Sequence, residues 1–307
     1  MNKPKFWDKQ YITFFSVILW PLSFFYQILL SVKKSLSKNK KFSTPIICVG
    51  NIYVGGTGKT PIASKIFEIF KNEKNPIIIK KNYKNQKDEI KLIEKYCRVL
   101  TPEKRIDGIY QAQKRNFDII ILDDGYQDFE IKKNLNIVCF NSKQKLGNGL
   151  VIPAGPLRQG LNSLSYCDII LFNGKQDIDF ENKLKKFNPK LEFVYYDYIS
   201  KDIDNFKNDK IIAFAGIGNP GNFFEFLKDN NLNIKKQIEY PDHYYYSKKN
   251  LDYLLDLKYK YSAKLLTTEK DYMRIDASNR ENFDFVSITP YFRNLDFFKN
   301  LIRKNIL

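Results

Sequence analysis

The chain has 307 residues, 43% of them hydrophobic and 15% aromatic, a composition that excludes a disordered protein and suffices for two lobes. Its 51 Lys and Arg residues against 34 Asp and Glu residues give a formal net charge of +17, which favours anionic partners. The four cysteines form no CxxC pair and have no histidine near them in the sequence, which disfavours a zinc site. They are expected to be small core residues of a protein in a reducing compartment: Cys48, Cys97, Cys139 and Cys167.

The first expected element is an apolar helix near the N-terminus. No residue between Lys9 and Lys33 is charged, and residues 11–32, YITFFSVILWPLSFFYQILLSV, are mostly large and apolar. A helix of this length measures about 33 Å, close to the hydrocarbon thickness of a bilayer. Residues 1–41 are therefore predicted to form a membrane-associated helix with a basic flank that meets anionic lipids. Pro21 leaves spanning and interfacial attachment both open, and a helix buried in the protein is the alternative.

From residue 42 onward, short apolar runs alternate with lysine-rich helical segments. The runs are continuous and β-branched, as expected of parallel strands buried on both faces: PIICVG (45–50), PIIIK (76–80), FDIIILDD (117–124), LNIVCF (135–140) and CDIILF (167–172). Between the first two runs, apolar residues recur at helical spacing: Ile62, Ile66, Ile69 and Phe70. Residues 42–205 are therefore predicted to form an α/β core with a mainly parallel sheet and flanking helices.

A second, less regular set of runs follows the polar segment SKDIDNFKNDK (200–210). It comprises KIIAFAGIG (210–218), a helix beginning near Asn222, AKLLTTEKD (263–271) and FDFVSITP (283–290). The boundary is expected near residue 205, and residues 206–307 are predicted to form a smaller C-terminal α/β lobe.

A glycine-rich turn joins the first predicted strand to the first predicted helix. It has three glycines within four positions and ends on a lysine and a threonine: Gly55, Gly56, Thr57, Gly58, Lys59 and Thr60. Backbone N–H groups of such a turn bind phosphate oxygens, the lysine reaches the β- and γ-phosphates, and the threonine hydroxyl binds Mg²⁺. The turn predicts a P-loop NTPase-like fold, although Tyr53 stands where the G-x-x-x-x-G-K-[ST] pattern has its first glycine. A purely structural glycine turn is the alternative.

Two adjacent carboxylates, Asp123 and Asp124, end the buried run IIILDD. In P-loop enzymes an acid at this position holds Mg²⁺ directly or through water. The pair is predicted to be the metal-binding acid, with the directly bound carboxylate left open; a helix cap or turn at a strand end is the alternative.

Six motifs in order carry a resemblance that covers nearly the whole chain: VGNIYVGGTGKTP (49–61), DDGYQD (123–128), GNGLVIPAGPLR (147–158), AGIGNP (215–220), PDHY (241–244) and TTEKD (267–271). Together they resemble tetraacyldisaccharide 4′-kinase, the lipid A 4′-kinase of Gram-negative bacteria. The resemblance implies transfer of the γ-phosphate of ATP, with Mg²⁺, to the 4′-hydroxyl of a tetraacylated glucosamine disaccharide 1-phosphate. It also implies a monomer on the cytoplasmic face of the inner membrane, in contact with anionic lipids.

The resemblance also assigns roles to individual residues. Lys59 and Thr60 match the family's phosphate and magnesium residues, Asp123 and Asp124 match its acidic pair, and Gln127 and Arg158 match positions near the substrate and phosphates. The family's catalytic aspartate and its partner histidine correspond to Asp88 in KDEI and His243 in PDHY; His243 is the chain's single histidine. In this assignment the carboxylate accepts the proton of the attacking hydroxyl, while the imidazole orients or charges the carboxylate.

The chain departs from the family pattern at several points on the substrate side. Lys80-Lys81-Asn82-Tyr83 replaces S-R-G-Y, and lysine lacks the bidentate fork of arginine. Residues 84–87 form a shorter connection to Asp88 than is usual in the family. Gln159 replaces the glutamate after P-L-R, and Asp128 closes the D-D-G-F-Q-H motif. A kinase with a trimmed substrate-side loop is the interpretation, with a catalytically impaired copy as the alternative.

Two other classes of function remain as alternatives. A membrane-attached P-loop ATPase or GTPase switch would turn over without a lipid acceptor, but the sequence has no N-K-x-D guanine-reading motif. A basic nucleic-acid-binding protein would need aromatic side chains stacked beside Lys and Arg, for which YYY (244–246) and VYYDY (194–198) are weak candidates. No nucleic-acid partner is therefore expected.

Overall fold

The computed structural model describes residues 4–55, 58–83 and 87–306, and these form two compact units. The large unit comprises Lys3–Asn82, Ile93–Tyr198 and Pro290–Leu307. Among the described residues, the small unit comprises those of Tyr83–Leu92 and Ile199–Thr289. The change from one unit to the other falls at Ile199, near the expected boundary, but the last segment of the chain belongs to the large unit instead of the C-terminal lobe.

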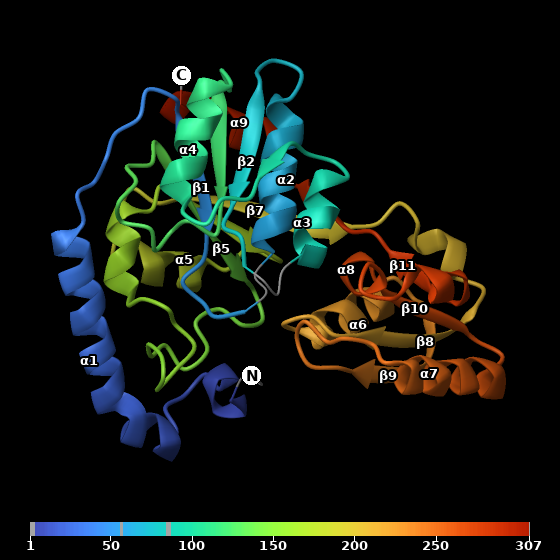
Figure 1. The fold of residues 1–307 in the computed structure, drawn as a ribbon. Coiled ribbons are helices and arrows are strands. Elements are labelled where there is room, and N and C mark those ends of the chain that lie inside the picture. Colours follow the sequence, from blue (N-terminus) through green and yellow to red (C-terminus); the bar gives the residue numbers. More distant parts are fainter. Residues whose placement is uncertain (1–3, 56–57, 84–86, 307) are drawn as a thin grey trace. The chain divides into compact units, whose positions relative to one another are not determined.

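The large unit is built on an eight-stranded sheet with the order β12-β7-β6-β5-β1-β4-β2-β3 (Figure 1). Its strands are β1 (Ile46–Gly50), β2 (Pro76–Lys80), β3 (Val99–Leu100), β4 (Ile119–Asp123), β5 (Leu135–Asn141), β6 (Ile169–Asn173), β7 (Glu192–Ile199) and β12 (Thr289–Phe292). From β3 through β7 every neighbouring pair is parallel. The predicted mainly parallel α/β fold is confirmed, and β1 lies between β4 and β5.

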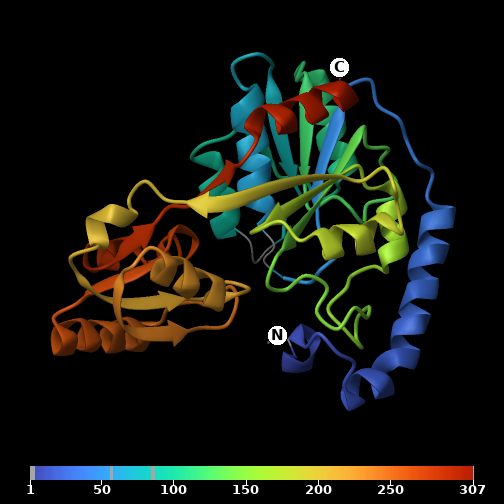
Figure 2. The same ribbon diagram turned by 180° about the vertical axis from the view of Figure 1, so that it is seen from behind.

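Helices cover both faces of this sheet (Figure 2). They are α2 (Lys59–Phe70), α4 (Arg105–Lys114), α5 (Ile178–Lys185) and α9 (Leu295–Ile306). A further helix, α3 (Lys87–Glu94), is divided between the units, because its residues up to Leu92 belong to the small unit. Side chains of α2 and α9 pack in one apolar cluster and side chains of α4 and α5 in another. Successive residues of β1 alternate between the two clusters, because side chains of a strand point to opposite faces.

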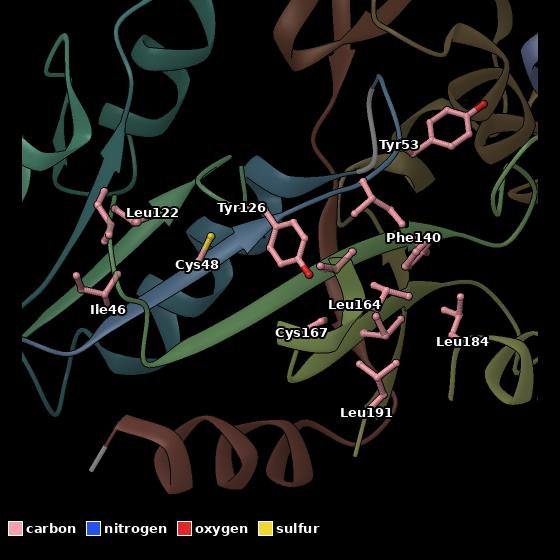
Figure 3. Close-up of a cluster of buried hydrophobic side chains, with 14 of the residues drawn as sticks. Ile46, Cys48, Tyr53, Leu122, Tyr126, Phe140, Leu164, Cys167, Leu184 and Leu191 are labelled. Atoms are coloured by element: carbon pink, nitrogen blue, oxygen red, sulfur yellow. The ribbon is translucent and has the colours of Figure 1, made fainter. Parts of the chain in front are cut away.

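The cluster on the α4 and α5 face also contains two of the cysteines, Cys48 and Cys167 (Figure 3). Cys97 and Cys139 belong to the cluster on the opposite face. All four are buried and free, as small core residues should be.

The small unit is built on a four-stranded sheet with the order β11-β10-β8-β9, in which all three neighbouring pairs are parallel. Its strands are β8 (Lys210–Ala215), β9 (Asn233–Glu239), β10 (Lys264–Thr268) and β11 (Asp284–Val286). Its helices are α6 (Pro220–Asp229), α7 (Lys248–Tyr261) and α8 (Glu269–Tyr272). Helices α6 and α7 belong to two separate apolar clusters that involve alternate residues of β8.

The predicted N-terminal helix is α1 (Phe14–Leu36), capped by Thr13. Its buried residues are Ser16 and Ser23, whereas most of its large apolar side chains are exposed: Phe14, Phe15, Val17, Ile18, Trp20, Leu22, Phe24, Phe25, Ile28, Leu29, Val32 and Leu36. By length and composition α1 qualifies as a membrane-crossing helix, as do some soluble helices and signal sequences. Exposure of its apolar side chains disagrees with the alternative of a helix buried in the protein.

Candidate active site

The phosphate loop connects β1 to α2, as the sequence predicts. Gly58 is the N-cap of α2 with φ 79°, and a Cβ there would lie 2.0 Å from the Tyr198 hydroxyl of β7. The left-handed backbone favours glycine, and a side chain there would also displace the tyrosine hydroxyl. Gly55 also has a positive φ, of 119°, and its carbonyl accepts a hydrogen bond from the fully buried Asn51 side chain. The predicted phosphate-binding residues Gly56 and Thr57 lie outside the described residues.

The parallel register brings the carboxyl ends of three strands side by side. Val49 of β1 and Lys80 of β2 both pair with Asp123 of β4. Asp123 is fully buried, and its Oδ2 accepts a hydrogen bond from the Thr60 hydroxyl at 2.9 Å and another from Lys80 Nζ at 2.6 Å. Within the described residues, Asp123 Oδ1 has no hydrogen-bond partner. A buried carboxylate oxygen without a donor, next to a threonine hydroxyl, fits a hard divalent cation such as Mg²⁺.

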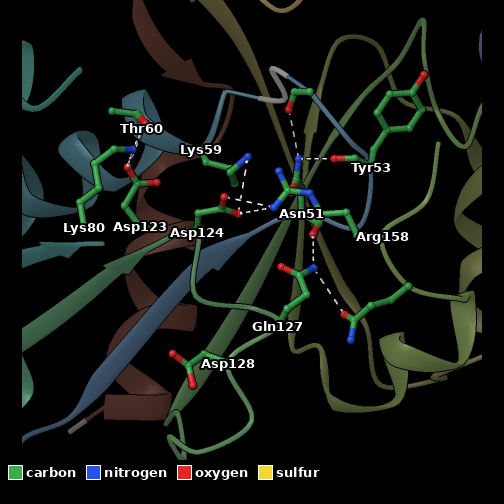
Figure 4. Close-up of polar contacts among 12 residues, drawn as sticks. Asn51, Tyr53, Lys59, Thr60, Lys80, Asp123, Asp124, Gln127, Asp128 and Arg158 are labelled. Atoms are coloured by element: carbon green, nitrogen blue, oxygen red, sulfur yellow. Dashed lines mark hydrogen bonds and ion pairs between the residues drawn. The ribbon is translucent and has the colours of Figure 1, made fainter. Parts of the chain in front are cut away.

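The second carboxylate, Asp124, is surrounded by positive charge (Figure 4). Arg158 Nη1 donates to both of its oxygens at 3.1 Å, and Lys59 Nζ lies 3.7 Å from Oδ1. Burial opposes ionisation, but the charges of Lys59 and Arg158 outweigh it and hold the pKa of Asp124 below its ordinary value. Burial lowers the pKa of Lys59, and the Asp124 carboxylate offsets part of that effect. Asp124 itself has φ 62°, an uncommon backbone conformation that is concentrated at functional sites.

Arg158 reaches this carboxylate because its own segment is hydrogen-bonded to the start of the phosphate loop. Its N–H donates to the Ile52 carbonyl at 2.6 Å, and Val54 N–H donates to the Pro156 carbonyl at 2.8 Å. Gln127, expected near the substrate, donates its amide N–H to the Asn51 carbonyl at 2.8 Å. In this structure the glutamine therefore supports the entrance of the phosphate loop.

The segment GNGLVIPAGPLR (147–158), which carries Arg158, also holds α1. Ser23 Oγ donates to the Val151 carbonyl at 2.8 Å and accepts from Ala154 N–H at 2.9 Å, while Asn148 Nδ2 donates to Ser16 Oγ at 2.9 Å. The polar side of an otherwise apolar helix is thus docked on the segment that carries Arg158. This arrangement leaves the apolar side of α1 uncovered by protein.

The predicted catalytic histidine belongs to the small unit, on the connection between β9 and α7. His243 Nε2 lies 3.9 Å from Glu89 Oε1, and Lys270 Nζ of α8 lies 2.5 Å from the same carboxylate oxygen. Glu89 belongs to the first turns of α3, which belong to the small unit. The side chain of Asp88, the expected base, lies outside the described part of the structure. Glu89 is therefore the described α3 carboxylate that faces His243.

Two residues of the site were not among the predicted site residues. Lys80 replaces the first residue of S-R-G-Y, and the sequence did carry a signal for its role. PIIIK and IIILDD both end on charged residues, and these residues meet if the two strands are parallel neighbours. Arg274, three residues beyond TTEKD, lies 3.3 Å from His243 Nδ1 through its Nη2. No local pattern marked this arginine.

The fold and the large-unit site define a P-loop-like α/β protein whose glycine turn, lysine and paired acids are suited to holding a phosphate chain and a divalent cation. The model of the family described as "Tetraacyldisaccharide-1-P 4'-kinase" matches residues 15–306. The chain belongs to this family of kinases.

Individual relatives agree with the family assignment. The chain is 43% identical to a tetraacyldisaccharide 4'-kinase of Pelagibacter ubique, over 93% of this chain and 92% of the relative. It is 35% identical to a tetraacyldisaccharide 4'-kinase of Rickettsia felis, over 90% and 89% of the two chains. A crystal structure of LpxK from Aquifex aeolicus in complex with ATP has the same fold, with a TM-score of 0.70, 24% identity and coverage of 95% of this chain and 99% of that one.

Proposed function

We propose that the chain is an ATP-dependent lipid kinase that transfers the γ-phosphate to the 4′-hydroxyl of a tetraacylated glucosamine disaccharide 1-phosphate, giving the 1,4′-bisphosphate. The observation that carries the proposal is the Lys59, Asp124 and Arg158 cluster beside the Thr60–Asp123 pair, in a chain of this family. Such a site suits phosphoryl transfer, because catalysis there consists mostly of positioning and charge stabilisation. The crystallised LpxK relative is in complex with ATP, which supports ATP as the phosphate donor.

In this proposal the large unit binds the nucleotide. The phosphate-binding residues are Gly55, Gly56, Thr57, Gly58, Lys59 and Thr60, and the magnesium residues are Thr60, Asp123 and Asp124. Bound Mg²⁺ would neutralise charge on the β- and γ-phosphates. Lys59 holds the γ-phosphate and stabilises the charge that develops on it. Arg158 is poised near the phosphates by its contact with Asp124, and Gln127 keeps the loop entrance in place.

Removal of the proton from the 4′-hydroxyl is assigned to Asp88, with His243 as its partner. A carboxylate suits this role because it accepts the proton as the hydroxyl attacks. Burial and the Lys270 charge lower the pKa of His243, and the Asp242 carboxylate opposes them in part. The imidazole is therefore neutral near pH 7 and orients its carboxylate partner through a hydrogen bond rather than through charge.

The acceptor is a lipid, so we assign α1 to the membrane interface on the cytoplasmic face of the inner membrane. Its exposed apolar side would enter the lipid while Ser16 and Ser23 stay docked on the protein. An open groove at its C-terminal end combines Leu29, Val32 and Leu36 with lysines, including Lys33. That combination suits anionic headgroups above acyl chains. We also propose that the protein acts as a monomer and binds no nucleic acid.

The test is incubation of the full chain with labelled ATP, Mg²⁺ and the detergent-dispersed disaccharide 1-phosphate lipid. We expect a bisphosphorylated lipid that carries label at the 4′ position, and no label on the same lipid with its 4′-hydroxyl blocked. ATP hydrolysis that is independent of lipid, with no labelled lipid formed, would favour the ATPase or GTPase switch instead.

A further inference from the structure

His243 is held by its backbone as well as by its ring. Its φ is 58°, a conformation that is uncommon for residues other than glycine. Its N–H donates to the Gly216 carbonyl at 3.1 Å and to Asp242 Oδ1 at 3.0 Å. These bonds fix the backbone position from which the imidazole extends, but they do not determine which ring nitrogen carries the proton.

Arg274 contacts both the imidazole and the carbonyl that holds its backbone. Its Nη1 donates to the Gly216 carbonyl at 2.7 Å and to Asp271 Oδ1 at 2.9 Å. Its Nη2 lies 3.3 Å from His243 Nδ1. The Arg274 side chain is 8% exposed, so its guanidinium is largely shielded from solvent.

Asp271 fixes the arginine in turn. Its carboxylate is fully buried, and Oδ2 accepts hydrogen bonds from Gly216 N–H at 3.0 Å and from the Thr268 hydroxyl at 2.8 Å. The carboxylate and the Gly216 carbonyl therefore determine the direction in which Arg274 Nη2 points. A guanidinium has five N–H donors and no acceptor, so the ring nitrogen that faces it must offer a lone pair.

We propose that Arg274 is a positioning residue that fixes the tautomer of His243, with Nδ1 unprotonated and the proton on Nε2. The Nε2–H then points to the side where Glu89 and Asp242 lie, each with a carboxylate oxygen 3.9 Å away. This inference rests on the proposed function in one respect: the proposed function is what makes His243 the partner of a catalytic carboxylate. The tautomer itself is a property of the nucleotide-free protein.

The charges around the ring agree with a neutral imidazole. Burial lowers the pKa of His243 most, and the Lys270 charge lowers it next. Asp242 opposes them in part, Arg274 lowers the pKa by a smaller amount, and Glu89 raises it least. Protonation would place an N–H on Nδ1 directly opposite the guanidinium, where two donors and two positive charges repel each other. Arg274 thus opposes both the other neutral tautomer and the cation.

The experiment uses the single histidine of the chain, since ring ¹⁵N NMR of histidine-labelled protein then reports His243 alone. With the full chain in detergent micelles and no nucleotide, we expect Nε2–H as the predominant tautomer at pH 7 and a pKa below the ordinary histidine value. A predominant Nδ1–H tautomer, or a ring that is cationic at pH 7, would overturn the proposal without recourse to any variant.

Two variants separate positioning from simple folding. Arg274→Met keeps the stem and removes the guanidinium, so we expect a mixture of tautomers and a higher pKa for His243. Arg274→Lys keeps the charge but not the fork, and we expect intermediate values. The matched control is Arg280→Met, because Arg280 also donates to backbone carbonyls of the small unit, those of Ile275 and Met273. Wild-type tautomer and pKa in both Arg274 variants would refute the proposal.

A kinetic measurement connects the tautomer to the reaction. We expect Arg274→Met to lower kcat on the order of 10- to 100-fold with little change in KM for ATP, as a misplaced catalytic group does. The Arg280 control should keep kcat near the wild-type value. If the wild-type protein shows the expected tautomer yet has no lipid kinase activity, the proposed function fails and the inference about Arg274 stands.

Discussion

At the scale of single residues, the large-unit site concentrates charge in a buried place. Lys59 and Arg158 both face Asp124, and Lys80 faces Asp123. Unpaired buried charges are costly, so each cation in the phosphate-free protein also stabilises a carboxylate. The two lysines nevertheless differ in what their removal should do.

Lys59→Ala should abolish most of the phosphoryl transfer while the fold stays intact. Arg158 remains as a partner for Asp124, so the free energy of unfolding should change little. Loss of a group that stabilises transition-state charge should lower kcat by about 10²- to 10³-fold or more. The assay is single-turnover formation of labelled lipid, and Lys65→Ala on the same helix, in an exposed pair with Glu68, is the control. Turnover near the wild-type rate would end the P-loop interpretation.

Lys80→Met should instead destabilise the nucleotide-free protein. Lys80 is 5% exposed and its ammonium lies 2.6 Å from the fully buried Asp123, so the variant leaves a buried carboxylate without its cation. Loss of one partner from such a pair costs about 3–5 kcal/mol. Because Thr60 and Asp123 fit Mg²⁺, added Mg²⁺ should raise the Tm of the variant more than that of the wild type. Calorimetry with and without Mg²⁺ tests this expectation; equal Mg²⁺ effects on both proteins would contradict it.

At the scale of elements, α1 has two sides with separate tasks. Its serines bond to the segment that carries Arg158, and its apolar side chains are exposed. This division explains why a segment apolar enough for a membrane also contains Ser16 and Ser23. A helix deletion would remove both tasks at once, so substitutions on one side at a time are the sharper test.

Changing exposed α1 residues to asparagine, for example Phe15, Leu22 and Leu29, should release the protein from membranes. The Tm should stay near the wild-type value, because these side chains are 57–68% exposed. Ser23→Ala should do the reverse: it leaves Ala154 N–H without its acceptor and lowers stability by about 1–3 kcal/mol, while membrane attachment persists. Vesicle co-sedimentation and thermal unfolding measure the two effects. Retention of the triple variant on vesicles would exclude α1 as the anchor.

At the scale of the whole molecule, the last helix of the chain, α9, supports the residues that pack beside Gly58 of the phosphate loop. Phe298 of α9 is fully buried and stacks on Phe292 of β12 with ring centroids 4.5 Å apart. Phe292 in turn packs on Tyr196 of β7, whose hydroxyl lies 3.1 Å from the Cβ position of Gly58. Residues of the last segment of the sequence therefore pack, through Tyr196, toward Gly58 at the start of α2.

Phe298→Ala should consequently destabilise the large unit, although the residue follows the whole small unit in sequence. Truncation of a buried phenylalanine costs about 3–5 kcal/mol. Hydrogen exchange should lose protection in β1 and β5 and keep it in β8 and β10, and Leu254→Ala in α7 should show the opposite pattern. Loss of protection confined to the small unit in the Phe298 variant would contradict the assignment of α9.

Some features of the fold could be predicted from the sequence and others could not, and the physical reason differs between them. The runs 45–50 and 76–80 correspond to β1 and β2 within a residue, because a buried parallel strand needs a continuous apolar run. The alternating strand β9 and the short β3 were not predicted, since partly exposed and very short strands have little apolar signal. The glycine turn was recognisable because its backbone needs glycine at Gly58 whatever the rest of the chain does.

The sequence by itself determined the features that depend on a few neighbouring residues: the apolar helix, the glycine turn with Lys59 and Thr60, the acids at the end of β4, and the motifs that identify the family. Tertiary structure alone decided which distant residues meet. Strand register brings Lys80 to Asp123, and the shared contact with the Gly216 carbonyl brings Arg274 to His243. It also decided which side of α1 is docked and that α9 returns to the large unit. Register and packing depend on the interactions between segments that are far apart in the chain, and a pattern of neighbouring residues does not contain that information.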